Sequence, residues 1–383
     1  MSSVPRRDVF DPDCVGVYHC YNRCSQRARL CGFDPVTQQD FSHRKDWIRD
    51  GLKDLAGAMA IDVLDYAVLD NHLHVILRNR PDVVAGWSDE EVVRRWWLVA
   101  PERRDEQGKP AEITQLELAS LLADQAQVNK LRSRLSDISW LMRQLCQSVA
   151  RRANKESNVT GRFFAPRFGC ERILDEAGLL ACSMYVNLNL VRAGMANTPE
   201  ESEYTSAFDR IRGHMQRQQA ELGQVSVGGD SGDDPDAWLA PLFLDERSEA
   251  YPTELQAADA GDDSALPAAD ASPSATTSIH GNSLGSPRAS EKGYLPLTLE
   301  AYLTLLDWTG RQLRDGQQGT IPSELLPILQ RLGIRPETWF DVVHGYDSKF
   351  RTVVGRVEAI RREALRRGRR WLQGLSSAAA VFL

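Results

Sequence analysis

Apolar and polar residues alternate along three short stretches near the start of the chain, at 16–24, 61–69 and 72–78. All three are rich in β-branched and aromatic residues, and alternation with a period of two is typical of strands that bury one face. Asp70 and Asn71, between the second and third stretches, have turn chemistry. The pattern therefore predicts a β-hairpin that ends at Pro81, together with an earlier strand.

Apolar residues then recur every three or four positions, as they do on the buried face of a helix. Helices are expected over 42–59, 88–100, 114–130 and 136–154 and from Asp175 onward, with Ser42 and Ser88 as N-caps. The second and third helices belong to a helical insertion at about 83–132. Residues 161–173 read as a strand that Pro166 restricts to an edge or a break. Together these elements predict an α+β domain with an antiparallel sheet over residues 1–221.

The composition changes at about residue 222, where Gly, Ser, Asp, Ala and Pro become frequent. Such a stretch buries too little apolar surface to fold alone, so 222–293 is predicted to be a disordered acidic linker. Residues 238–243, which include Trp238 and Phe243, interrupt it and are candidates for docking on a folded surface. From residue 294 the helical period returns, which predicts a small basic helical module over 294–383.

The net charge of −7 conceals an uneven distribution. Residues 222–290 hold twelve acidic residues against Arg247 and Arg288, a net −10, so the remainder of the chain carries +3. The basic residues cluster at 151–172 and 361–370, which is typical of a protein that binds a polyanion. Two solvated helix faces are the equally weighted alternative.

Other classes of protein are disfavoured by composition. The 383 residues contain no apolar run long enough for a membrane span, and the first residues lack the apolar stretch of a signal peptide. Seven cysteines in a chain of this size are expected to be free thiols in a reducing cytoplasm. Cys14, Cys20, Cys24 and Cys31 cluster near His19, but their spacing matches no standard zinc pattern.

The most informative residues are two histidines and a distant helix. His72 and His74, two apart on a strand, point to one face and can clamp a divalent cation through neutral imidazoles. Tyr185 and Asn189 stand at i and i+4 on the expected helix and share a face. A cation beside a tyrosine is what attack on a phosphodiester by a tyrosine nucleophile requires. The alternatives are an ordinary polar stripe on the strand and a core tyrosine.

Four motifs in this order resemble the single-tyrosine HUH transposases, in particular the REP-associated tyrosine transposases. They lie within residues 15–212 and read Tyr18-His19-Cys20-Tyr21-Asn22-Arg23, Asp70-Asn71-His72-Leu73-His74, Arg162-Phe163-Phe164-Ala165-Pro166-Arg167-Phe168 and Tyr185-Val186-Asn187-Leu188-Asn189-Leu190-Val191-Arg192-Ala193-Gly194. No single motif is decisive, and the ordered set carries the resemblance.

The resemblance implies a ferredoxin-like HUH endonuclease fold that cuts single-stranded DNA beside a hairpin, in the cytoplasm with the nucleoid. It implies Mg²⁺ or Mn²⁺ on His72, His74 and Asn189, with Tyr185 as nucleophile, and no organic cofactor. Three residues depart from the family pattern, namely Asp70, Asn187 and Leu190, which stand where proline, glutamate and proline are usual. Relatives include monomers and homodimers, and the sequence decides neither.

DNA contacts are expected from arginines in both basic clusters and near the tyrosine, namely Arg151, Arg152, Arg162, Arg167, Arg192, Arg366, Arg367, Arg369 and Arg370. The C-terminal arginines could instead solubilise a bundle that packs through Trp308, Leu313, Trp339 and Trp371. A domesticated protein that binds repetitive palindromic DNA without cutting it is the alternative function. A zinc hydrolase is disfavoured because the other five histidines form no further motif.

Overall fold

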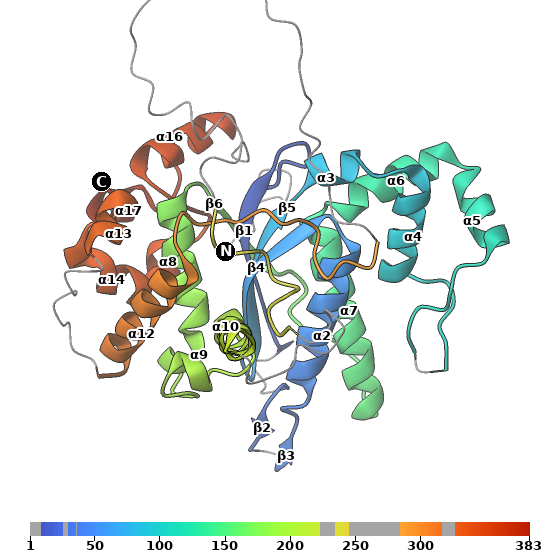
Figure 1. Ribbon diagram of the computed structural model, residues 1–383, viewed down its shortest axis with the longest axis horizontal. Coiled ribbons are helices and arrows are strands. Elements are labelled where there is room, and N and C mark those ends of the chain that lie inside the picture. Colours follow the sequence, from blue (N-terminus) through green and yellow to red (C-terminus); the bar gives the residue numbers. More distant parts are fainter. Residues whose placement is uncertain are drawn as a thin grey trace, which may run out of the picture.

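The computed structural model describes residues 9–25, 30–35, 37–106, 108–222, 234–244, 284–315 and 326–383 (Figure 1). Within these ranges no helix is long and apolar enough to cross a membrane. Most of the expected linker, 223–233 and 245–283, lies outside the described residues, as do residues 316–325 of the expected helical module.

The centre of the molecule is a sheet of five strands in the order β4-β5-β1-β6-β7. All neighbours are antiparallel except β6 and β7, which are parallel. The strands are β1 (Gly16–Arg23), β4 (Ile61–Val68), β5 (His72–Asn79), β6 (Gly169–Ile173) and β7 (Val353–Val354). The expected α+β class and the β4–β5 hairpin are confirmed. A separate pair, β2 (Phe33–Asp34) and β3 (Gln39–Asp40), lies outside this sheet.

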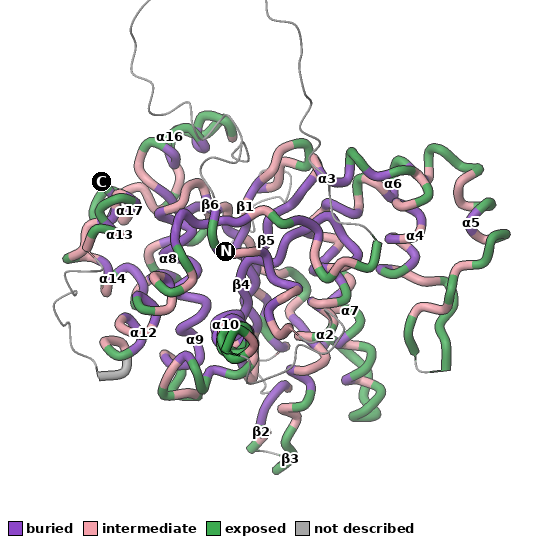
Figure 2. Tube along the Cα trace, in the orientation of Figure 1, coloured by how far each residue is buried: buried purple, intermediate pink, exposed green. Residues whose placement is uncertain are grey.

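Helices cover both faces of the sheet (Figure 1). On one face, α2 (Arg44–Ala58) and α7 (Ile138–Glu156) enclose a core with the strand residues Tyr18, Val75 and Leu77. On the other face, α8 (Glu176–Asn187) packs over Leu64 and Ile76. Figure 2 shows the sheet buried on both sides. Adjacent residues of a strand point to opposite faces of the sheet. Each strand residue therefore packs either in the core under α2 and α7 or in the core under α8.

The helical insertion forms as expected, with one difference. It consists of α3 (Pro81–Ala85), α4 (Asp89–Val99), α5 (Gln115–Leu122) and α6 (Gln125–Leu135). Ser88 caps α4 by accepting from the backbone of Glu91. The single helix expected over 114–130 is two helices, because the Asp124 side chain accepts a hydrogen bond from Gln127 and starts α6 anew.

Two other expected boundaries are wrong. Ser42 does not cap α2, since its hydroxyl donates to Asp40 instead. The strand expected over 161–173 is regular only from Gly169, and Phe164 makes an isolated bridge to Cys24. Pro166 lies in the irregular part, where its missing amide hydrogen breaks no ladder.

The residues after 294 are helical, as expected, and they share a hydrophobic core with α8. Tyr302, Trp339, Tyr346 and Phe350 are fully buried in that core. The helices are α12 (Leu299–Asp315), α13 (Leu326–Arg331), α14 (Trp339–His344), α15 (Tyr346–Lys349), α16 (Val357–Arg366) and α17 (Leu375–Val381). The division of the chain at residues 221 and 294 stays a prediction, but this segment lies against the sheet and extends it by one strand.

A buried polar network also joins this segment to the sheet. Asp65 of β4 accepts hydrogen bonds from Asn187, Ser206 and Tyr294, and Asn187 also donates to Tyr302. Ser206 begins α10 (Ser206–Glu221), which follows the four-residue helix α9 (Asn189–Arg192). Buried polar groups are costly without partners, so the network fixes the position of 294–302 on the sheet.

The described ends of the expected linker are packed as well. Trp238 and Leu239 are buried, as the docking expected for 238–243 requires, and the backbone of Ala240 donates to Val63 of β4. The Ser290 hydroxyl donates to the buried Asp62, which also pairs with Arg78. These two short segments therefore belong to the folded body.

Candidate active site

His72 and His74 lie on β5 with their side chains on the α8 face of the sheet. Leu73 and Val75 point to the opposite core, so the alternation expected from the sequence is present. The two imidazole rings have centroids 5.0 Å apart and are nearly perpendicular. His74 is 5% exposed, whereas His72, at the open end of the strand, is only partly buried.

Tyr185 of α8 lies beside His74. Its ring centroid is 5.6 Å from that of His74, in an edge-to-face arrangement. Arg192 places its guanidinium carbon 4.6 Å from the centre of the Tyr185 ring. Segments about 110 residues apart in sequence thus bring together the histidine pair, the tyrosine and one arginine that the sequence singled out.

The opposite side of the Tyr185 ring is covered by Tyr346 of α15. The two rings stack with centroids 4.8 Å apart and planes 26° apart. Tyr185 is consequently 5% exposed. The sequence contained no signal for this contact. Periodicity predicts local elements, and it does not say where the segment that carries Tyr346 packs relative to α8.

Two further residues of the site, His19 and Glu171, were not assigned a role from the sequence. Nε2 of His19 is 2.9 Å from Nδ1 of His74, and Nδ1 of His19 is 3.2 Å from the Glu171 carboxylate. All three side chains are at most 5% exposed. When both imidazoles are neutral, Nδ1 of His19 donates to Glu171 and Nε2 of His19 accepts from Nδ1 of His74. The free lone pair of His74 is then on its Nε2 atom.

Burial sets the protonation states of the site. Burial lowers the pKa of His72 to about 4, with the Arg23 charge acting in the same direction. Burial and the neighbouring His19, His72 and Arg23 lower the pKa of His74 well below its usual value. Burial raises the pKa of Tyr185 to about 12, against the opposing effect of Arg192. At neutral pH His72 and His74 are therefore neutral and the phenol is protonated. Burial opposes the charge of His19, but Cys182 and Glu171 outweigh it and raise the pKa of His19 to about 10. A cation on Nε2 of His74 would therefore displace one proton from the His19–His74 pair.

The helix that carries Tyr185 is interrupted before Asn189. α8 ends at Asn187, Leu188 caps it, and α9 begins at Asn189. Asn187 belongs to the buried network around Asp65 and is structural. Asn189 is 7% exposed, and its Nδ2 atom is buried without a hydrogen-bond partner. An unpaired N–H donor of this kind suits an oxygen of a bound ligand, whereas a cation would have to be held by the Oδ1 atom of Asn189.

The side chains around His72 and His74 offer only part of the ligands that a divalent cation needs. Within the described ranges, no group of three or more His, Cys, Asp or Glu side chains could hold a metal ion. The two imidazoles still fit a partial site, because Nδ1 of His72 is engaged by Asn71 at 2.6 Å and Nδ1 of His74 by His19. Both Nε2 atoms are then the ones left for a cation. Asn189 and substrate oxygens would have to complete its coordination.

The arginines expected to contact DNA occupy three places. Arg192 is in the site, and Arg151, Arg152, Arg162 and Arg167 lie exposed at and beyond the end of α7. Arg366 and Arg367 of the C-terminal cluster are paired with Glu363, and the Arg367 side chain is only 4% exposed. Arg369 and Arg370 lie exposed. Arg367 is thus the least suited of the nine to contact a phosphate.

Comparisons with known proteins give one match. No protein-family model matches the chain, and no curated protein matches it. A solved structure described as a REP-associated tyrosine transposase bound to a REP hairpin is similar over 61% of this chain and 94% of its own, with 12% identity and a TM-score of 0.30. A similarity at this level does not establish a family for the chain.

Proposed function

We propose that this protein is a metal-dependent single-stranded DNA endonuclease and strand transferase that acts beside hairpin DNA. The observation that carries the proposal is the meeting of Tyr185 with the His72–His74 pair, at 5.6 Å between the ring centroids of Tyr185 and His74. A tyrosine beside two neutral imidazoles whose Nδ1 atoms are already engaged would supply a nucleophile and two cation ligands.

The proposed fold is the ferredoxin-like HUH endonuclease fold. It is supported by the chain order β1, α2, β4, β5, α7, β6 combined with the strand order β4-β5-β1-β6. This is a βαββαβ unit in which the two helices follow the first and third strands. The central strands β5 and β1 then carry His72, His74 and His19, so the site sits in the middle of the sheet.

Each residue of the site would have its own role in the cleavage of a phosphodiester. His72, His74 and Asn189 would hold Mg²⁺ or Mn²⁺, which neutralises the charge of the scissile phosphate. The Tyr185 hydroxyl would lose its proton and attack phosphorus, forming a 5′-phosphotyrosine, while the displaced 3′ oxygen takes up a proton. Arg192 lies over the Tyr185 ring and favours the phenolate. The phosphodiester energy is retained, so the strand can be rejoined.

Access to the nucleophile is restricted. Tyr346 stacks on Tyr185, and both rings are buried. Because Tyr185 is 5% exposed, a phosphodiester can reach its hydroxyl only if residues around it move. The C-terminal segment supplies Tyr346, so its movement would uncover one face of the ring.

The test is formation of a covalent protein–DNA adduct with a labelled single-stranded hairpin, with Mg²⁺, with Mn²⁺ and with EDTA. Tyr185→Phe, which removes one hydroxyl, should abolish the adduct and leave hairpin binding near that of the wild type. Tyr204→Phe is the matched control, because the Tyr204 ring lies beside Arg49 of α2, in the core on the opposite face of the sheet from His74. An adduct that survives in Tyr185→Phe, or in EDTA, would contradict the mechanism.

The alternative function, a non-catalytic binder of repetitive palindromic DNA, is favoured by one observation, the burial of Tyr185. It predicts hairpin binding by the wild type and no adduct in either metal. The same experiment therefore separates the two functions.

A further inference from the structure

Trp371 is placed unlike the other aromatic residues of the C-terminal segment. It is 69% exposed, whereas Trp339 is fully buried in the core. Leu365 nearby is 78% exposed. The alternative in which Trp371 packs inside a helical bundle is therefore wrong. Single exposed apolar residues are common on proteins, but an exposed tryptophan beside an exposed leucine marks a surface suited to a partner.

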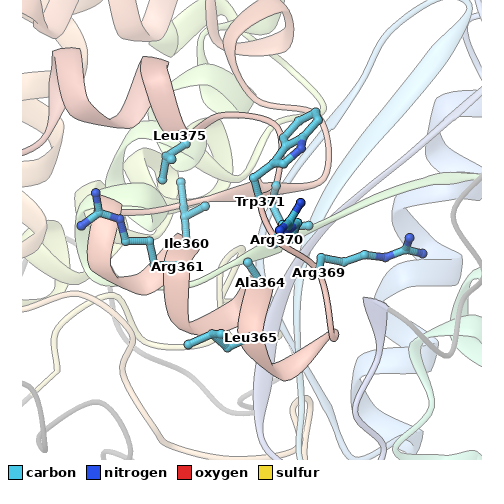
Figure 3. A pocket seen from close by; sticks show the side chains of 9 residues that line it. Ile360, Arg361, Ala364, Leu365, Arg369, Arg370, Trp371 and Leu375 are labelled. Atoms are coloured by element: carbon cyan, nitrogen blue, oxygen red, sulfur yellow. The ribbon is translucent and has the colours of Figure 1, made fainter.

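These two side chains line a cavity of about 320 Å³ between α16 and α17 (Figure 3). Its floor is apolar, made by Ile360 and Ala364 of α16 and by Leu372 and Leu375. Figure 3 shows Trp371 across from the α16 side chains that line the hollow. A flat aromatic wall over an apolar floor suits a planar ring that inserts beside the indole.

The rim of this cavity is cationic. Arg361, Arg369 and Arg370 contribute to its lining. Among the residues that the structure describes, Arg361 and Arg370 take part in no ion pair, because the nearby Glu363 carboxylate is shared by Arg172, Arg366 and Arg367. The charges of Arg361 and Arg370 are left for an anionic partner. A planar apolar group attached to an anion matches this combination.

The cavity leads towards the candidate active site. A second hollow of about 440 Å³ shares Trp371, Leu372 and Leu375 with the first and reaches Ser348 and Lys349 of α15. The same short helix begins with Tyr346, whose ring stacks on Tyr185. A polynucleotide bound at Trp371 would therefore lie next to the helix that covers the proposed nucleophile, with Lys349 on its path.

We propose that Trp371 is a stacking platform for an unpaired base of single-stranded DNA, with Arg361 and Arg370 holding the adjoining phosphates. Stacking on an aromatic side chain with phosphates on arginines is how proteins bind single strands with little sequence preference. The inference names the strand that flanks the hairpin as the ligand of this surface, and in that respect it rests on the proposed function. A duplex, whose bases are already stacked, cannot use the platform.

The test measures binding without cleavage, by fluorescence anisotropy in EDTA on the Tyr185→Phe background. The probes are a labelled oligothymidylate, a hairpin with an unpaired flank, and the same hairpin without it. Trp371→Ala should weaken oligothymidylate binding about tenfold, as loss of one stacked base does. Trp371→Phe should weaken it less, and the bare hairpin should be bound equally by all variants.

Two controls complete the test. Leu116→Ala replaces another highly exposed apolar side chain, 82% exposed on the distant α5, and should change nothing. Arg370→Ala should lower the salt dependence of oligothymidylate binding by about one counterion. All of these are surface changes, so circular dichroism should show folded proteins throughout.

Two results would overturn the inference. One is equal loss of bare-hairpin and single-strand binding in Trp371→Ala. The other is unchanged binding of the oligothymidylate by Trp371→Ala. If that variant has also lost binding to vesicles that contain anionic lipid, the surface is assigned to a membrane. Failure of the proposed catalysis is a different result, namely no adduct in the wild type while Trp371→Ala still loses single-strand affinity.

Discussion

Glu171 is joined to the candidate site through His19. Its carboxylate accepts from His19, which in turn bonds to Nδ1 of His74. Glu171→Gln can also donate to His19 and thereby favour the wrong ring tautomer of both histidines. We expect the apparent affinity for Mn²⁺ to fall roughly tenfold or more, as it does for lost partners of metal-ligating histidines, with hairpin binding in EDTA unchanged.

The measurement is a Mn²⁺ titration of adduct formation. Glu200→Gln, an exposed carboxylate elsewhere, is the matched control. If Glu171→Gln and Glu200→Gln have the same Mn²⁺ midpoint, the chain of hydrogen bonds only supports packing.

His72 links stability to pH. Burial lowers its folded-state pKa to about 4, below the value of about 6.5 of an unfolded chain. Between these values the unfolded chain binds more protons, so the contribution of His72 to stability is present above pH 6.5 and is lost as the pH falls towards 4. In metal-free buffer, the urea midpoint should rise from pH 4.5 to pH 7 less steeply in His72→Gln than in the wild type. Equal slopes would mean that His72 is more exposed to water than the structure indicates.

The sequence singled out His72, His74 and Tyr185 but not the residues that contact them. His72 and His74 were found because alternation on a strand is local information, and Tyr185 because a helix period is local too. His19 and Glu171 could not be found in this way, since their contact arises from pairing of β1 with β6, at a separation of 152 residues. The departure at Asn187 also has its reason in distant residues, Asp65 and Tyr302.

Asp175 joins the start of α8 to the segment just before α16. One carboxylate oxygen caps the helix by accepting from Gly178, and the other accepts from the backbone of Arg356 just before α16. Asp175→Ala would leave two amide groups without partners, so we expect a loss of about 2 kcal/mol in the free energy of unfolding. Asp137→Ala removes a cap of α7 alone and should cost about 1 kcal/mol. Urea unfolding of the two variants checks the difference, and equal losses would show that the Arg356 contact contributes nothing.

Helices and strands could be predicted from the sequence where the apolar pattern repeats over many residues. The ends of these elements and the breaks within them could not. The α7 helix and the β4–β5 hairpin follow from repeated local signals. The breaks at Leu188 and Asp124 do not interrupt the apolar period, so a reading of periodicity runs through them. Ser42 has the right chemistry for a cap, but the neighbouring Asp40 attracts its hydroxyl.

At the scale of the whole molecule, the C-terminal segment is expected to be needed for the fold. A protein that ends at residue 293 would lose Tyr294 and Tyr302 from the network around Asp65 and leave the α8 core open. We expect it to lack a cooperative unfolding transition and to bind a dye for exposed apolar surface. Co-expression of residues 294–383 as a separate chain should restore the transition. A truncated protein that unfolds at the wild-type midpoint would show instead that the first 221 residues fold alone.

This dependence was not predictable from composition. The Gly- and Asp-rich stretch after residue 222 has the signature of a spacer between independent units, and composition does not say what its two ends touch. The structure places Trp238, Leu295 and Tyr302 against the same sheet that the first residues build.

The strand β6, which lies next to the edge of the sheet, has a consequence for when the candidate site can form during synthesis. It pairs with β1 on one side, but its other side is covered only by β7, whose Val353 and Val354 lie close to the end of the chain. During synthesis, roughly 180 residues emerge after β6 before its partner does. Until then the nascent chain exposes an unpaired strand edge and the open face of α8, which are the surfaces on which unfinished chains aggregate. The residues up to Val354 must have left the ribosome before the candidate active site is enclosed.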